Sequence, residues 1–442
     1  MNNAPRTSLF PRSFSKHYPV ATRGEGVYLW DSNGNRYMDL AASAVVNFIG
    51  HGDQDVSAAI ARQLHDLEFV HSSQFVTQAA LDFADQVLEF AGPAFECGAV
   101  FFTSGGSEAV ESALKLARQY QVEIGQSARS RIISRKQSYH GSTFGAMSVS
   151  GNRQRREIYL PMLHSNEQVN TPYCYRCVYG CDLCAEKYAA EVAELLARTA
   201  HETAAFIFEP VSGATLGAVV PPNVYLQEVT RVCHDRGVLL IADEVMTGFG
   251  RTGRNFAVDH WNIAPDIIVA GKGISSGYAP LGAVIANKKV VDAIANGSGQ
   301  LIHGFTYNAH PVSVAAGAAV LDKTKRLISE MPAIESHLCS ELNSLQNCTS
   351  VGDVRGLGML WAVEFVSDRN MKTPFAAARK FALAVGAAAM KRGVVVYPMQ
   401  GCVDGINGDH VLIAPPAIIT LKEIDWAVNE LEAAICEVVR GN

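Results

Sequence analysis

Two reactive side chains follow two short apolar runs in the middle of the chain. Residues 238–242 and 267–270 have the length and composition of buried strands in a parallel sheet. Asp243 follows the first run, and Lys272 follows the second within Gly-Lys-Gly. Open α/β sheets bind ligands beyond the carboxyl ends of their strands, so both groups are expected at one site. A carboxylate that pairs with a ring nitrogen and an amine that forms an imine are the protein groups that pyridoxal phosphate (PLP) requires.

Other interpretations of this stretch fit less well. The run LLIADE resembles a Walker B strand, but no GxxxxGK[ST] loop accompanies it: Gly273 follows Lys272, and Asp266 takes the place of the first loop glycine. Residues 248–253 match GxGxxG without directly following a strand or opening an apolar helix, so the match is interpreted as coincidence. A lysine considered alone would be a solvated surface residue.

A glycine-rich turn is expected upstream. Residues 99–102 read as a buried strand and residues 109–120 as a helix, with Ser104-Gly105-Gly106-Ser107-Glu108 between them. Backbone N–H groups and the dipole at a helix N-terminus favour a phosphate there. A simple turn with a serine N-cap explains the same residues equally well.

Two further strand ends carry candidate site residues. Tyr139-His140-Gly141 comes after a strand at 131–133, and the planar face of Tyr139 suits stacking on a ring, although core packing is the alternative. Glu209 directly follows a strand at 205–208, where it is either at the ligand edge or solvated. His140 receives no functional role from the sequence.

The run DEVMTGFGRTG at 243–253, followed by GKG at 271–273, resembles the signature of class III (omega-type) PLP-dependent aminotransferases, and the resemblance extends over nearly the whole chain. It implies that Lys272 holds PLP and that Asp243 pairs with its ring nitrogen. It also implies that Tyr139 stacks on the ring and that Glu209 and Val245 lie beside the cofactor. The phosphate is assigned to Gly105, Gly106 and Ser107.

The resemblance also implies a partner subunit. Thr306 lies in a Gly-Phe-Thr segment whose threonine, in this family, reaches the phosphate bound by the neighbouring subunit. The expected assembly is therefore a homodimer with shared active sites. An N-cap or turn threonine is the plain alternative.

The expected fold is α/β, PLP fold type I (aspartate aminotransferase-like), with a mainly parallel sheet in a large domain and a smaller α/β domain. The predicted division is 1–65 for an N-terminal segment that packs with the small domain, 66–330 for the large PLP-binding domain and 331–442 for the small domain. Further elements are expected as helices at 78–90, 185–197, 311–327, 374–391 and 421–439, and as strands at 359–365, 394–397 and 411–414.

Composition excludes some classes of function. The 442 residues are 48% hydrophobic and 18% charged, with a net charge of −6, which is typical of an ordinary globular protein. This mildly negative charge does not indicate binding to nucleic acid or to an anionic membrane. No apolar run in the sequence is long enough to cross a bilayer. The basic N-terminus lacks an apolar or sustained amphipathic segment, so we interpret it as an arm rather than a targeting peptide and expect a cytoplasmic protein.

The chain has 10 cysteines, four of them close together at Cys174, Cys177, Cys181 and Cys184. Their spacing is too short for a zinc ribbon and differs from that of ferredoxins. Reduced thiols in a cytosolic enzyme are the favoured interpretation, and metal binding remains the alternative.

Two positions bear on the substrates. Met246 stands where several relatives that use 2-oxoglutarate have glutamine, which favours pyruvate as the acceptor. Gly405 takes the place of the arginine with which many relatives of the amine:pyruvate branch bind the substrate carboxylate. This arginine is therefore absent here, or its role is taken by Arg176 or Arg153. Of these two, Arg176 is expected to be solvated. The predicted reaction moves an amino group from a primary amine or omega-amino acid to a keto acid; a PLP-dependent lyase, racemase or aminomutase, or a non-catalytic PLP-binding protein, are alternatives.

Overall fold

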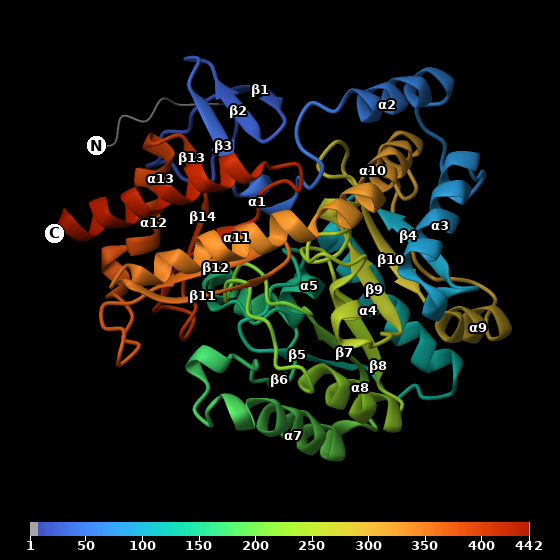
Figure 1. The fold of residues 1–442 in the computed structure, drawn as a ribbon. Helices are drawn as coiled ribbons and strands as arrows, with labels where there is room; N and C mark the ends of the chain where they lie inside the picture. The colour runs from blue at the N-terminus through green and yellow to red at the C-terminus, as the bar shows by residue number, and fades with distance from the viewer. Residues whose placement is uncertain (1–7, 442) are drawn as a thin grey trace.

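The computed structural model describes residues 8–441, and the first seven residues of the expected N-terminal arm lie outside this range. A seven-stranded sheet forms its centre, in the order β4-β10-β9-β8-β7-β5-β6 (Figure 1). Strand β10 runs antiparallel to both neighbours and the other pairings are parallel, which confirms the predicted α/β class with a mainly parallel sheet. The strands are β4 (Ala99–Thr103), β5 (Arg131–Arg135), β6 (Gln168–Val169), β7 (Thr203–Phe208), β8 (Leu239–Asp243), β9 (Ile267–Ala270) and β10 (Gly282–Ala286).

Helices cover both faces of this sheet, which explains why its central strands are continuously apolar. Alternate residues of β8 enter different cores: Leu240 and Ala242 pack on one face, Leu239 and Ile241 on the other. The first face is covered by α3 (Gln78–Ala91), α7 (Cys181–Thr199), α8 (Tyr225–Asp235) and α10 (Pro311–Glu330). The second face is covered by α4 (Gly106–Glu123), α5 (Phe144–Val149) and α9 (Lys288–Asn296).

The strand directions bring five connections to one edge of the sheet. Strands β5, β7, β8 and β9 are mutually parallel, and β4 points the same way because both β4 and β9 are antiparallel to β10. The segments that follow these strands therefore meet at the carboxyl edge, where such sheets place their ligands. This arrangement brings together sequence positions from 104 to 272.

Two smaller sheets lie beside the large one. One has the order β1-β2-β3-β13 and the other β11-β12-β15-β14. Strand β13, from the C-terminal part, pairs in parallel with β3 from the N-terminal part, so the two chain ends share a sheet. The strands are β1 (Ala21–Glu25), β2 (Tyr28–Asp31), β3 (Arg36–Asp39), β11 (Val351–Leu357), β12 (Leu360–Phe365), β13 (Val394–Val395), β14 (Tyr397–Gln400) and β15 (Asp409–Ile413). The domain boundaries at 65 and 330 stay predictions.

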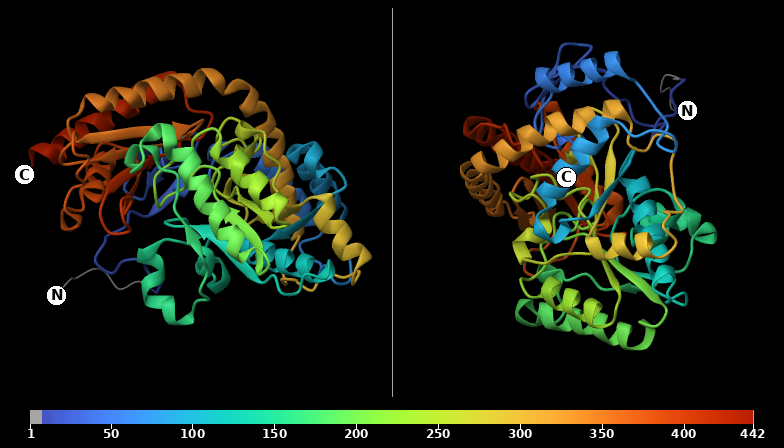
Figure 2. Two further views of the ribbon diagram at one scale, coloured as in Figure 1. Left: turned by 90° about the horizontal axis from the view of Figure 1, so that it is seen from below. Right: turned by 90° about the vertical axis from the view of Figure 1, so that its right-hand side faces the viewer.

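A second hydrophobic core joins the two chain ends. Leu40 and Phe48 of the N-terminal part pack in the same cluster as Val363, Ile413 and Leu431. Phe48 is 1% exposed and belongs to this core. Figure 2 shows α10 running along the molecule toward the C-terminal part. The remaining helices here are α1 (Ala42–Val45), α2 (Gln54–Asp66), α11 (Pro332–Ser344), α12 (Phe381–Lys391) and α13 (Leu421–Arg440).

Two predicted elements of the C-terminal part are wrong. The expected helix at 374–391 begins as an α-helix only at Phe381, because Lys380 has a φ of 49° in the left-handed region and separates it from a 3₁₀ turn, Ala377–Arg379. The expected strand at 394–397 is split between β13 and β14, which belong to different sheets.

Arg176 corrects another prediction, since it is neither solvated nor free for a substrate. Its guanidinium lies 2.6 Å from the Glu364 carboxylate, and its side chain is 14% exposed. Arg355 contacts the same carboxylate at 2.8 Å and donates to the carbonyl of Gly217. Burial would raise the pKa of Glu364, but the charges of Arg355 and Arg176 outweigh this effect and lower it. The cluster ties the 173–176 loop to strand β12.

Replacing Glu364 with glutamine is expected to lower the free energy of unfolding by about 3–5 kcal/mol, because it leaves the guanidinium of Arg176 without a carboxylate and that of Arg355 with Asp353 alone. Urea denaturation followed by circular dichroism measures the change. The control is Glu430→Gln, which removes a surface partner of Arg392 and should cost below about 1 kcal/mol. Equal losses in the two variants would contradict the structural role of Glu364.

Candidate active site

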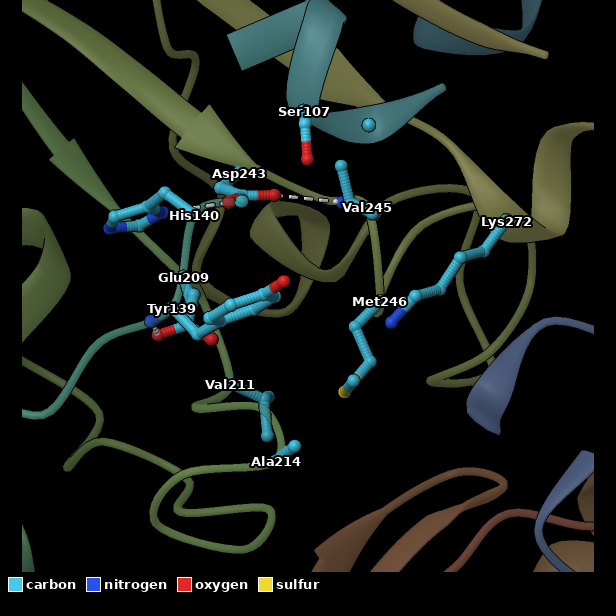
Figure 3. Close-up of a pocket in the computed structure, with 12 residues that line it drawn as sticks. Ser107, Tyr139, His140, Glu209, Val211, Ala214, Asp243, Val245, Met246 and Lys272 are labelled. Carbon is cyan, nitrogen blue, oxygen red and sulfur yellow. Dashed lines mark hydrogen bonds and ion pairs between the residues drawn. The ribbon is translucent and has the colours of Figure 1, made fainter. Parts of the chain in front are cut away.

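A pocket opens at the carboxyl edge of the large sheet, where the predicted residues converge (Figure 3). Seven of the nine predicted site residues line it: Gly106, Ser107, Tyr139, Glu209, Asp243, Val245 and Lys272. The remaining lining residues are Met246, which the sequence linked to the choice of acceptor, and four that the sequence did not assign to the site: His140, Gly141, Val211 and Ala214. Gly105 and Thr306 lie outside the lining.

Lys272 enters the pocket from β9. It has a φ of 44°, which is uncommon for a residue with a side chain, and lies between two glycines. A Cβ on Gly271 would lie 3.2 Å from a methyl group of Val245, so this connection is closely packed. Figure 3 shows the Lys272 side chain reaching toward Met246 from the side opposite His140. Burial lowers the pKa of Lys272 to about 8, against the opposing charges of Asp243 and Glu209.

Asp243 is held by two hydrogen bonds. His140 Nδ1 lies 2.7 Å from Oδ2, and the backbone N–H of Val245 donates to Oδ1 at 3.1 Å. Both the histidine and the aspartate are buried. Sequence reasoning missed His140; its position in the segment that follows β5 at this edge was the available signal. Its other ring nitrogen, Nε2, is buried without a hydrogen-bond partner among the described residues.

Glu209 is also buried, and its carboxylate accepts backbone hydrogen bonds from Gly213 at 2.9 Å and Tyr139 at 3.4 Å. Burial raises the pKa of Glu209, the nearby His140 lowers it, and Asp243 raises it. Arg135 donates to the backbone carbonyl of Glu209. Glu209 therefore fixes the loop that carries Gly213 while presenting a carboxylate at the pocket.

Helix α4 begins at Gly106, three residues earlier than the sequence predicted, so it includes part of the expected phosphate turn. Gly106 and Ser107 lie in the first turn of this 18-residue helix, and Gly105 is its N-cap, with no side-chain cap bond. A Cβ on Gly106 would lie 2.9 Å from a Val245 methyl group, so the backbone approaches closely here. The first-turn N–H groups and the helix dipole suit a phosphate.

Tyr139 forms a wall of the pocket, and its hydroxyl lies 2.9 Å from Ser142 Oγ. Thr306 lies outside the pocket, on an exposed turn between α9 and α10. The same segment carries the exposed apolar residues Ile302 and Tyr307. A lysine amine, a buried carboxylate and an open helix N-terminus around one cavity fit PLP.

Comparison with known proteins agrees with this geometry. Residues 10–435 match the family model of the class-III aminotransferases. The chain belongs to this family. An uncharacterized aminotransferase of Bacillus subtilis (strain 168) is 36% identical over 439 residues, which cover 98% of each chain. The adenosylmethionine-8-amino-7-oxononanoate aminotransferase of Geobacter sulfurreducens is 35% identical over 96% of this chain and 93% of its own.

A solved structure of an amine transaminase from an uncultivated Pseudomonas species, in its PLP-bound form, superposes with a TM-score of 0.91. It is 34% identical and covers 98% of this chain and 99% of its own. These findings confirm the predicted family, fold type I and the PLP cofactor. The protein is a PLP-dependent aminotransferase with amine and keto-acid substrates.

The cysteine cluster gains no support as a metal site. Among residues 8–441, one group of three or more His, Cys, Asp or Glu ligand atoms lies within 4.8 Å of one another, and it consists of the half-buried His337, Glu341 and Asp425. Cys181 and Cys184 lie in the first turn of α7, and all four thiols are free. Over the same range, no helix is both long and apolar enough to cross a membrane.

Proposed function

We propose that this aminotransferase moves an amino group from a primary amine or omega-amino acid to a keto acid, with pyruvate as the acceptor. The observation that carries the proposal is the apolar substrate end of the pocket, formed by Val211, Ala214 and Met246 next to Lys272. The thioether of Met246 cannot act as a useful hydrogen-bond donor, unlike the glutamine of several relatives that use 2-oxoglutarate. The solved relative named as an amine transaminase is consistent with such a donor.

The roles of the residues follow from their contacts. Lys272 would hold the cofactor covalently and, once released, would move a proton to and from the substrate carbon as a general base. Asp243, oriented by His140 and by the N–H of Val245, would keep the ring nitrogen protonated, since a nearby anion stabilises the charged form. When bound, PLP supplies the electron sink for the reaction. Tyr139 would stack on the ring, and Gly106 and Ser107 would hold the phosphate.

The lowered pKa of Lys272 predicts how the apoprotein takes up PLP. Only the neutral amine attacks an aldehyde, and burial places its pKa at about 8 instead of the ordinary 10.5. The rate at which added PLP becomes covalently bound should rise with pH and level off above about pH 9, one unit above that pKa. Stopped-flow absorbance at a series of pH values measures it. A rate that still increases tenfold per unit above pH 9.5 would contradict an amine of this pKa.

We also propose that the active enzyme is a homodimer whose sites are shared. Thr306 is exposed and lies in the same segment as Ile302 and Tyr307, which are 75% and 58% exposed and whose apolar side chains suit burial against a second copy. In a dimer, Thr306 would reach the phosphate in the partner's pocket. Sedimentation analysis of Thr306→Ala and wild-type holoenzyme, together with their PLP affinities, tests this arrangement: weaker PLP binding by an intact dimer is expected.

The proposed reaction is tested by a screen of donors and acceptors on purified holoenzyme, read from the cofactor spectrum in each half-reaction. We expect a primary amine or omega-amino acid to convert the cofactor to its amino form in stoichiometric amount, and pyruvate to restore it faster than 2-oxoglutarate. Turnover of an amine without any keto acid would instead indicate a lyase, racemase or aminomutase. Faster restoration by 2-oxoglutarate would contradict the role given to Met246.

A further inference from the structure

The place where many relatives carry a carboxylate-binding arginine is closed to that side chain here. Gly405 has a φ of 88°, which strains any residue with a Cβ. A Cβ at this position would lie 3.1 Å from Cβ of Arg153. The short helix α6 (Arg153–Arg156) therefore packs against this loop. A cation that serves the pocket must come from another element.

Most nearby guanidinium groups already have partners. Arg176 is bound to Glu364, as described above. Arg153 lies 3.5 Å from the Glu157 carboxylate on the exposed surface. Arg251 is buried and donates to the carbonyls of Pro415 and Asn47. Arg176 and Arg251 are therefore held by buried partners, and neither of the two candidates that the sequence suggested, Arg176 and Arg153, lines the pocket.

Arg155 differs from them. Its guanidinium carbon lies 4.6 Å from the centre of the Tyr139 ring, and Tyr139 lines the pocket. Its positive charge is close enough to Lys272 to contribute to lowering that amine's pKa. Within residues 8–441, its guanidinium forms no ion pair and donates no hydrogen bond, although the side chain is half-buried. Burial of a charge without a partner is costly, so a half-buried guanidinium without a carboxylate is a candidate to receive one from a ligand.

We propose that Arg155 binds the carboxylate of the substrate at the mouth of the pocket. The inference rests on the proposed function, because it assigns one end of the same substrates. The planar guanidinium presents paired N–H donors that match a carboxylate, and stacking on Tyr139 leaves these edge donors free. Small keto acids such as pyruvate, and omega-amino acids, carry the group that it recognises. Amines without a carboxylate would bind through the apolar residues alone.

The first test uses propionate, which has a carboxylate but neither an amine nor a keto group. Its dissociation constant for the holoenzyme is measured by calorimetry with wild type, Arg155→Gln, Arg155→Lys and the control Arg153→Gln. We expect Arg155→Gln to weaken binding about 10- to 100-fold, Arg155→Lys to weaken it less, and the control to change it below about 2-fold. Equal affinities of wild type and Arg155→Gln would overturn the proposal.

The second test separates binding from the positioning of Tyr139. Arg155→Gln should raise the pyruvate concentration needed for half-maximal rate about 10- to 100-fold and leave the half-reaction with 2-aminobutane within about 3-fold. If both half-reactions and the cofactor spectrum change together, Arg155 only positions the ring and the proposal is wrong. If the variant uses both 4-aminobutyrate and pyruvate less well, Arg155 binds the carboxylate of the donor and that of the acceptor. If it uses only pyruvate less well, Arg155 binds the carboxylate of the acceptor alone.

A failure of the Arg155 proposal can be distinguished from a failure of the proposed function. A wild-type holoenzyme that transfers no amino group between amines and pyruvate would contradict that function. Propionate affinity would still report on Arg155, because propionate undergoes no reaction.

Discussion

Lys272→Ala is expected to abolish the visible absorption of the covalently bound cofactor and to reduce turnover by at least about 10³-fold. The loss combines the covalent attachment with the general base, and a positioned base alone contributes about 10²- to 10⁴-fold. No other lysine can replace Lys272 in binding the cofactor, because Lys272 is the one lysine that lines the pocket among the described residues. Absorbance of the purified variant after addition of PLP, followed by single-turnover kinetics, measures both effects.

The matched control is Lys288→Ala. Lys288 lies at the start of α9, is 58% exposed and pairs with Asp292 on the surface. It should keep the spectrum and the turnover of wild type. If Lys272→Ala retained the visible band, or turned over within about 10-fold of the control, the pocket described here would not be the site of cofactor attachment.

Asp243→Asn is expected to slow the chemical step by about 10²- to 10⁴-fold while the protein stays folded. The amide keeps the shape of the side chain and can still accept the hydrogen bond from His140, but it removes the negative charge that holds a proton on the ring nitrogen. Loss of one member of a buried charge pair costs about 3–5 kcal/mol, and about 1.4 kcal/mol corresponds to a factor of ten in rate. Rapid-mixing measurements of each half-reaction give the rate.

Asp266→Asn provides the comparison. Asp266 is a buried carboxylate just before β9, at the opposite edge of the sheet, where it pairs with Lys289 and His234. This variant should lose stability without a specific loss of rate. Unchanged turnover in Asp243→Asn, or equal slowing in both variants, would refute the role of Asp243.

Much of the large domain was predictable because its strands are buried on both faces. A run such as 267–270 is apolar throughout and ends at reactive residues, so strand β9 was predicted at its observed bounds. The positions of Asp243, Glu209 and Lys272 at the carboxyl edge then follow from sheet direction. The assignments of Gly106, Ser107 and Val245 depended on the family resemblance, because a turn at a helix start has several uses.

What sequence could not supply is the pairing of distant side chains. His140 and Asp243 are 103 positions apart, and their hydrogen bond depends on the parallel order of β5, β7 and β8. Arg176 looked solvated because its partner, Glu364, lies on another sheet. The sequence did not indicate Arg155, because what sets it apart is that its guanidinium has no ion-pair partner among the described residues, and this is visible only in the structure. The predicted start of the helix near Lys380 was wrong because one residue with a left-handed backbone conformation, Lys380, determines where the helix begins.

The most direct test of the site is to reduce the holoenzyme with borohydride and to locate the trapped cofactor by peptide mass spectrometry. Reduction makes the bond between lysine and cofactor permanent, so the modified peptide identifies the residue without any assumption about substrates. We predict one stoichiometric adduct on the peptide that contains Lys272. An adduct on another lysine, or none on an enzyme that is catalytically active, would contradict the active site described here.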